Sequence, residues 1–215
     1  MKTKAVIFDF DGVIADTEPI HYRAFQSVLT PLGMEYSWKE YLDLYAGFDD
    51  RDAFRERYRR MGKSLDEAAL NDLAQRKAKS FESLVSTGVA KPYPGVVDLV
   101  RAQSGIRPIA LCSGAVRSDI LPVLRSLGLD GAFPTMVTAE DVDVSKPDPA
   151  SYRLAVERLG GGIQPAECLA IEDTPAGIQS AKSAGLRVIA VTNTYGREKL
   201  FGADRIVTSL AGLRL

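Results

Sequence analysis

The feature that most constrains the fold of this 215-residue chain is the alternation of short strand-like runs with helix-like stretches, without an internal sequence repeat. Residues 5–8 and 168–171 are apolar throughout, as in strands buried on both faces of a parallel sheet. Strands are expected at residues 5–8, 108–112, 135–138, 168–171, 188–191 and 205–207. Such alternation implies a mostly parallel sheet wrapped by helices, with right-handed crossovers. The predicted fold class is α/β with a Rossmann-like core.

A helical segment interrupts this alternation. From Pro19 to about Val85, helix periodicity and capping signals recur without a convincing strand. Four helices are expected: one from Pro19 that ends before Pro31, one within 37–46, one capped by Asp49 or Asp50, and a long one that starts at a capping box of Ser64 and Glu67. We therefore predict a four-helix cap domain at 16–87, inserted into a core made of 1–15 and 88–215.

The composition excludes several classes of partner. The formal net charge of −1 gives no electrostatic reason to expect nucleic acid or an anionic membrane. No run approaches the roughly 18 apolar residues of a membrane span, and the amino terminus lacks a signal-peptide pattern. Cys112 and Cys168 lie in apolar runs, which suits buried free thiols. We expect a cytoplasmic monomer without nucleic-acid or membrane partners.

Two carboxylates, Asp9 and Asp11, follow the first apolar run. Asp9 is expected at the carboxyl end of a strand, where open α/β sheets bind ligands, and Gly12 lets the backbone turn tightly. Residues two apart in an extended segment point the same way, so both carboxylates can face one pocket. A hard cation such as Mg²⁺ would offset their repulsion. The alternative is an Asp-x-Asp that only caps a turn.

Polar residues also follow the later strands. Ser113 and Gly114 come between a strand and a helix, where they present a hydroxyl and N–H groups to an anion; a plain helix N-cap is the alternative. Lys146 stands in a loop before a helix, either facing the site or solvated at the surface. Glu172 and Asp173 end another strand, and with Asp9 and Asp11 they would build a carboxylate-rich cup that needs a cation, although Asp173 or Thr174 could simply cap the next helix.

Four of these segments, DFDGVIADTE, LCSGA, SKPDP and IEDTPAG, resemble in order the signature motifs of the haloacid dehalogenase-like superfamily. The helical insert after the first motif is similar to that of the subfamily containing β-phosphoglucomutase and many sugar-phosphate and phosphoglycolate phosphatases. Any one motif is weak, but four in order across essentially the whole chain are specific. True dehalogenases of the superfamily lack an acid at the position of Asp11 and need no Mg²⁺, so dehalogenation is not expected.

The resemblance implies a role for each motif residue. Asp9 would be the nucleophile that becomes an aspartyl-phosphate, and Asp11 the general acid and base, with its backbone carbonyl on Mg²⁺. The phosphoryl group would be held by Ser113, Gly114, Ala115 and Lys146. The metal would be held by Asp9, Asp11, Glu172 and Asp173.

The insert would select the substrate and close over the core. His21, the only histidine, resembles a residue after the hinge of β-phosphoglucomutase, and Lys77 resembles a lysine there that contacts substrate; a surface imidazole and a solvated lysine are the alternatives. The mutases have an Arg three residues after a Gly, and it grips a second phosphate. Here Arg51 comes four residues after Gly47 and follows an Asp, which weakens the mutase interpretation.

The function expected is a Mg²⁺-dependent phosphatase that hydrolyses a small phosphorylated metabolite through an Asp9 phosphoenzyme, with a sugar phosphate as the expected substrate class. A β-phosphoglucomutase-like phosphotransferase is the main alternative. From a different class, the chain could be a non-catalytic phosphate- or metal-binding module or a receiver-like domain. A receiver domain should lack the insert, and a degenerate binding module should have lost Asp9 or Lys146.

Overall fold

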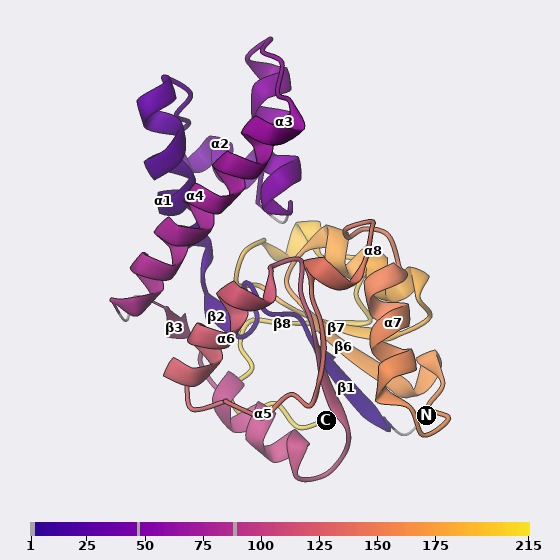
Figure 1. Cartoon of the computed structure of the whole chain (residues 1–215). Helices are drawn as coiled ribbons and strands as arrows, with labels where there is room; N and C mark the ends of the chain where they lie inside the picture. The colour runs from indigo at the N-terminus through magenta and orange to yellow at the C-terminus, as the bar shows by residue number, and fades with distance from the viewer. Residues whose placement is uncertain (1–2, 47, 88–89) are drawn as a thin grey trace. The chain divides into compact units, whose positions relative to one another are not determined.

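The computed structural model describes residues 3–46, 48–87 and 90–215. The chain divides into two compact units, Thr17–Ala90 and a unit made of Met1–Asp16 and Lys91–Leu215 (Figure 1). Compared with the cap predicted at 16–87, this compact helical unit starts one residue later and ends three residues later.

The larger unit is built on a six-stranded sheet in which every neighbouring pair is parallel. Across the sheet the strands are β5 (Thr135–Val137), β4 (Ile109–Cys112), β1 (Ala5–Phe8), β6 (Cys168–Glu172), β7 (Arg187–Val191) and β8 (Arg205–Val207). β1 lies near the middle, with Ile7 opposite Ala110 and Ala170, and its four residues are completely buried. The predicted parallel α/β fold is confirmed.

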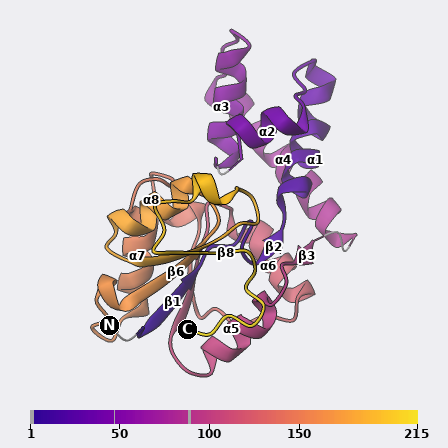
Figure 2. The same cartoon turned by 180° about the vertical axis from the view of Figure 1, so that it is seen from behind.

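Helices cover both faces of this sheet. In Figures 1 and 2, α7 (Ala150–Leu159) and α8 (Pro175–Ser183) lie on one side, and α5 (Val96–Ser104) and α6 (Arg117–Ser126) lie on the other. Short 3₁₀ turns occur at Ala139–Asp141, Pro165–Glu167 and Arg197–Lys199. Cys112 and Cys168 are buried free thiols, as expected. Along the described ranges, none of the helices has both the length and the apolar character needed to cross a membrane.

A two-stranded ribbon, which the sequence did not indicate, stands where the chain leaves and re-enters this unit. β2 (Ala15–Asp16) pairs antiparallel with β3 (Lys91–Pro92). The N–H of Tyr93 extends the pairing with a 3.2 Å hydrogen bond to the carbonyl of Ile14. Two-residue strands are too short to leave a periodic signal, so only their pairing shows them.

The smaller unit is helical. Its helices are α1 (Glu18–Leu29), a 3₁₀ turn at Thr30–Leu32, α2 (Trp38–Leu44), α3 (Asp50–Arg60) and α4 (Glu67–Ser86). Buried aromatic side chains, among them Phe25, Tyr41 and Phe54, form its own apolar core. A helical unit with an independent core is therefore inserted after the first strand of the sheet.

The helix starts in this unit follow side-chain caps. Asp49 caps α3, because its Oδ1 accepts the N–H of Asp52 at 2.9 Å. The predicted capping box of Ser64 and Glu67 is wrong. Asp66 is the N-cap of α4, and its side chain accepts the N–H of Ala69. Glu67 is therefore the first helical residue, and its side chain forms ion pairs with Arg51 and Arg55 of α3.

Candidate active site

Three adjacent strands end in the residues that the motifs singled out. Asp9 follows β1, Ser113 follows β4, and Glu172 ends β6. Because these strands are parallel neighbours, their carboxyl ends meet at one edge of the sheet. Lys146 reaches the same edge from the loop before α7, where the Lys146–Pro147 peptide is cis. Segments far apart in sequence thus converge on one place.

Lys146 connects two of the carboxylates. Its Nζ lies 2.6 Å from Oδ1 of Asp9 and 2.7 Å from Oε1 of Glu172, and it also donates to the carbonyl of Cys112 at 3.1 Å. The side chain is only 11% exposed, so the solvated-lysine alternative is wrong. Burial disfavours the ammonium, but Asp9 and Glu172 outweigh it and hold the pKa of Lys146 well above its usual value.

The environment of Asp9 raises its pKa. Burial is the largest cause; the Lys146 ammonium opposes the rise, and the carboxylates of Glu172 and Asp11 add to it. A buried acid that must ionise needs more positive charge nearby than one lysine supplies. This is the electrostatic setting in which a carboxylate cluster takes up a cation.

Glu172 accepts hydrogen bonds on both of its carboxylate oxygens. Its Oε1 accepts from Lys146 and from the hydroxyl of Tyr152, the latter at 2.8 Å. Its Oε2 accepts the N–H groups of Asp173 and Thr174 and the Thr174 hydroxyl. The ring of Tyr152 also lies 5.0 Å from Nζ of Lys146. Burial and the nearby Glu172 raise the pKa of Tyr152 well above its usual value, so it stays a donor.

Tyr152 was not singled out from the sequence. The available signal was its place in the first turn of α7, six residues after Lys146, on a helix whose inner face packs on the sheet. A fully buried tyrosine needs a partner for its hydroxyl, and a site acid is a natural one.

The acids form a candidate metal site. Asp9, Glu172 and Asp173 are buried and each offers an oxygen within 4.8 Å of the others. Ligand atoms on opposite sides of a Mg²⁺ ion lie roughly 4.2 Å apart, so small side-chain shifts would suffice. Three carboxylates against the one ammonium of Lys146 leave two negative charges, which suits a divalent ion that prefers oxygen ligands. These three residues fit Mg²⁺, whereas the backbone carbonyl of Asp11 as a further metal ligand stays a prediction.

Asp11 and Ser113 meet at this edge. The hydroxyl of Ser113 donates to Oδ2 of Asp11 at 3.4 Å and accepts the N–H of Ala115 at 3.0 Å. The N-cap of α6 is Val116, so the interpretation of Ser113 as a plain helix cap is wrong. Gly114 lies in the exposed turn between Ser113 and Ala115. Among the later residues, Thr174 is the one that caps α8, through the N–H of Gly177.

The loop after Asp11 requires a glycine. Gly12 has a φ of +78°, and a Cβ there would stand 1.9 Å from Oδ2 of Asp173 and 2.7 Å from the hydroxyl of Thr194. The amide of Asn193 donates to the carbonyl of Gly12 at 2.7 Å. The loop after β7 therefore supports the loop that follows Asp11. No pattern in the sequence around Asn193 indicated this contact.

In the helical unit, His21 and Lys77 lie together. Nζ of Lys77 is 2.7 Å from Nδ1 of His21 and 2.7 Å from Oδ1 of Asp50. Both side chains are buried, so the alternatives of a surface imidazole and a solvated lysine are wrong. Arg51 instead binds Asn71 and Glu67 at the surface. Gly47, the remaining residue expected here, is outside the described residues.

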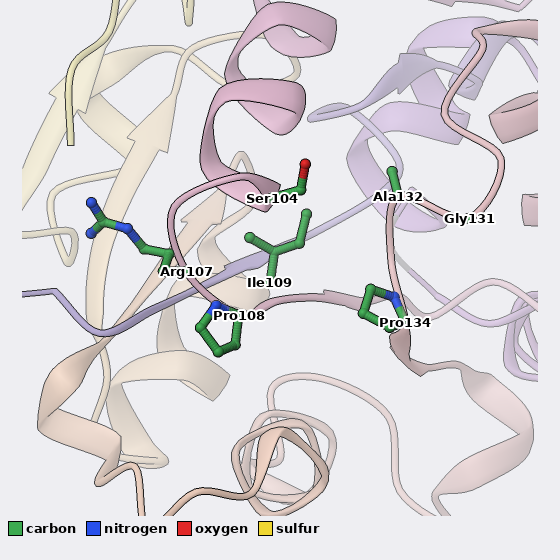
Figure 3. Close-up of a pocket in the computed structure, with 7 residues that line it drawn as sticks. All are labelled: Ser104, Arg107, Pro108, Ile109, Gly131, Ala132 and Pro134. Carbon is green, nitrogen blue, oxygen red and sulfur yellow. The ribbon is translucent and has the colours of Figure 1, made fainter.

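A pocket of about 350 Å³ lies elsewhere on the larger unit (Figure 3). It is lined by Ser104, Arg107, Pro108, Ile109, Gly131, Ala132 and Pro134. Ile109 is the first residue of β4 and the others precede β4 or β5, so the pocket lies at the end of the strands opposite the acids. The guanidinium of Arg107 points away from the other lining residues in Figure 3 and donates to the carbonyl of Thr3. The pocket is not part of the carboxylate site.

The fold and the strand-end residues together define an α/β protein with a helical insert after its first strand. Comparison with known proteins identifies the class: the model of the haloacid dehalogenase-like hydrolase family matches residues 6–191. The chain belongs to this family, which confirms the resemblance in the sequence. It is an enzyme, a phosphatase of this family, although phosphoglucomutases also occur among its structural neighbours.

Three relatives illustrate the similarity. Fructose-1-phosphate phosphatase YqaB of Escherichia coli is 34% identical over 188 residues, which are 86% of this chain and 95% of the relative. The structure of a CbbY mutant from Rhodobacter sphaeroides in complex with xylulose-(1,5)bisphosphate has a TM-score of 0.89 at 28% identity, covering 98% of this chain and 96% of that one. A β-phosphoglucomutase from Clostridium difficile has a TM-score of 0.88 at 26% identity, covering 99% and 94%.

Proposed function

We propose that this enzyme is a Mg²⁺-dependent phosphatase that hydrolyses a small phosphorylated carbohydrate through a phosphoenzyme on Asp9. The observation that carries the proposal is the convergence of Asp9, Lys146, Glu172 and Asp173 at one sheet edge. A site for transfer of a dianionic group needs an anionic nucleophile and enough positive charge to bring the two together.

The chemistry assigns one task to each core residue. An oxygen of Asp9 attacks phosphorus as the ester oxygen departs, and Asp11 protonates that oxygen. Asp11 then takes a proton from the water that attacks the aspartyl-phosphate, which releases inorganic phosphate and restores Asp9. The Ser113 hydroxyl, 3.4 Å from Asp11, supports the orientation of that carboxylate.

The remaining residues neutralise and bind the negatively charged phosphoryl group. Lys146 neutralises the nucleophile and the phosphoryl oxygens, while Ser113 and the N–H groups of Gly114 and Ala115 bind the transferring group. Mg²⁺, when bound, would be held by Asp9, Glu172 and Asp173, with the Asp11 carbonyl, and would supply positive charge against the phosphate.

The substrate class follows from the relatives and the insert. YqaB is named a fructose-1-phosphate phosphatase, and another relative, from Thermotoga maritima, is named a phosphorylated carbohydrates phosphatase. We assign substrate selection and closure over the site to the helical cap, which includes His21 and Lys77. A monomer in the cytoplasm, without nucleic-acid or membrane partners, completes the proposal.

A β-phosphoglucomutase-like phosphotransferase is the second candidate, because such a mutase is a structural neighbour over nearly the whole chain. The two differ in the acceptor of the phosphoenzyme, which is water or a sugar hydroxyl. Arg51, the residue expected to grip a second phosphate, forms an ion pair with Glu67 at 2.6 Å, which favours the phosphatase.

A phosphorus NMR time course tests the proposal. The protein is incubated with Mg²⁺ and a mixture of sugar phosphates that includes fructose 1-phosphate, β-glucose 1-phosphate and a trace of glucose 1,6-bisphosphate. Growth of inorganic phosphate from one component is expected, and it names the substrate. Conversion of β-glucose 1-phosphate to glucose 6-phosphate with little inorganic phosphate would establish the mutase instead.

A further inference from the structure

The loop that carries Asp11 is held by the side chain of Asn193, from a distant part of the chain. The side-chain amide of Asn193, just past the end of β7, donates to the carbonyl of Gly12 at 2.7 Å. Gly12 directly follows Asp11 and is buried. A buried carbonyl needs a hydrogen-bond donor from the protein, and Asn193 supplies one. This bond therefore fixes the peptide group that lies one residue after the proposed acid and base.

The loop after β1 is closed by its own backbone hydrogen bonds. The carbonyl of Phe10 accepts the N–H of Ile14 at 2.8 Å, and the N–H of Gly12 donates to the carbonyl of Ala15 at 3.1 Å. These bonds join the loop to itself, so they set its shape but not its position against the sheet. Because a closed loop moves as a unit, a contact at Gly12 also restrains the neighbouring Asp11.

The backbone that presents Asn193 is attached to the sheet. The N–H of Thr192, the residue before it, donates to the carbonyl of Val207 in β8 at 3.0 Å. Thr194, the residue after it, also approaches the loop, because a Cβ added to Gly12 would stand 2.7 Å from the Thr194 hydroxyl. The amide of Asn193 thus comes from a segment held by two strands and in close contact with the loop.

The carboxylate of Asp11 needs such support. The hydroxyl of Ser113 contacts its Oδ2 at 3.4 Å, which is long for an O–H···O hydrogen bond. A general acid must lie within hydrogen-bond reach of the oxygen that it protonates, and a misplacement of 1 Å costs about a hundredfold in rate. The position of Asp11 therefore depends on the backbone that carries it as well as on Ser113.

We propose that Asn193 is a positioning residue for Asp11 and acts through the carbonyl of Gly12. The proposal rests on the proposed function. In its first step an oxygen of Asp9 bonds to phosphorus, the ester P–O bond breaks, and the proton of Asp11 passes to the released oxygen. In its second step Asp11 takes a proton from the attacking water. Asn193 influences both steps through the loop that holds Asp11.

Two substrates with different leaving groups distinguish positioning of Asp11 from general damage to the site. A sugar alkoxide is strongly basic and needs a proton as it departs, whereas the p-nitrophenolate of p-nitrophenyl phosphate is weakly basic and departs without one. Single-turnover experiments with enzyme in excess measure release of the sugar or of p-nitrophenolate, and so the first step alone. In Asn193→Ala, release of the sugar should slow about tenfold and release of p-nitrophenolate by less than about twofold.

Two further variants complete this test. Asn193→Asp keeps the size of the side chain but replaces the donor by a carboxylate that repels the Gly12 carbonyl, so its sugar release should be at least as slow. It carries the comparison if Asn193→Ala is unfolded by circular dichroism. Thr192→Ala is the matched control and should leave both rates unchanged, because its N–H bond to Val207 is retained. Equal slowing with both substrates, or slowing with neither, would overturn the proposal.

Hydrogen exchange of the loop gives a reading that needs no turnover. In Asn193→Ala without substrate, the N–H groups of Gly12 and Ile14 should exchange with deuterium about tenfold faster than in the wild type, and in Thr192→Ala at the wild-type rate. Unchanged exchange in Asn193→Ala would refute the anchoring of the loop by Asn193. Faster exchange in that variant, together with a wild type that cleaves neither substrate, would instead refute the phosphatase function and the catalytic role of Asn193 and leave only the anchoring.

Discussion

The hydroxyl of Tyr152 donates a 2.8 Å hydrogen bond to Oε1 of Glu172, and both side chains are completely buried. This pair connects the first turn of α7 to the end of β6, and the Tyr152 ring lies beside the Lys146 ammonium. Tyr152 therefore contacts both Glu172 and Lys146, the carboxylate and the ammonium beside Asp9.

Tyr152→Phe should keep the fold and weaken the site. Loss of a hydrogen bond to a buried carboxylate costs about 2 kcal/mol, so the free energy of unfolding should fall by that amount and kcat by about tenfold. Urea unfolding and steady-state kinetics measure the two effects, with Tyr58→Phe in the helical unit as the control. An unchanged kcat would show that Tyr152 has no part in positioning Glu172.

Asp9→Asn should abolish turnover without unfolding the protein. Burial raises the pKa of Asp9, so ionised Asp9 destabilises the fold at neutral pH, where the unfolded chain ionises it freely. A neutral amide of the same shape should thus leave the thermal midpoint unchanged or raise it. Asp130→Asn, at an exposed position, is the matched control. Normal activity in the Asp9→Asn variant would remove Asp9 from the role of nucleophile.

Gly12→Ala should reduce the affinity for Mg²⁺ as well as the stability. The added Cβ would collide with Oδ2 of Asp173 and must displace this carboxylate. Gly33→Ala is a strict control, because Gly33 also has a positive φ, +61°, but an added Cβ meets nothing within 4 Å. Both variants should lose about 1–2 kcal/mol to backbone strain. Calorimetric titration with Mg²⁺ should show a large loss only for Gly12→Ala, and equal affinities would contradict the assignment of Asp173.

Acid stability should depend in part on Asp141. Its hydrogen bond with Arg158, followed by bonds from Thr138, lowers the pKa of Asp141 to about 2. The stabilisation is complete above the pKa of an unfolded aspartate, about 3.9, and is lost as the pH falls toward 2. Asp141→Asn should therefore lower the free energy of unfolding at pH 5, by no more than about 1 kcal/mol for a partly exposed pair, and have little effect near pH 2. Urea unfolding at both pH values measures this, and an equal loss at the two would contradict it.

The sequence by itself determined the parallel core, the helical insert and the family. Unbroken apolar runs and helix periodicity are local signals, and the four motifs each occupy one short segment. Local signals also placed Asp9, Ser113 and Glu172 at strand ends, because a strand stops where its apolar run stops. These signals misplaced the start of α4, where Asp66 rather than Ser64 is the N-cap.

Only the tertiary structure decided which side chains touch. The partners of Lys146 are 137 and 26 residues away in the chain, and those of Lys77 come from two other helices. Nothing in a linear pattern distinguishes a lysine that is solvated from one enclosed by carboxylates, because the difference is the burial created when distant elements pack. The roles of Tyr152, Asn193 and Asp50 have the same origin, since each is defined by a contact across the fold rather than by its neighbours in sequence.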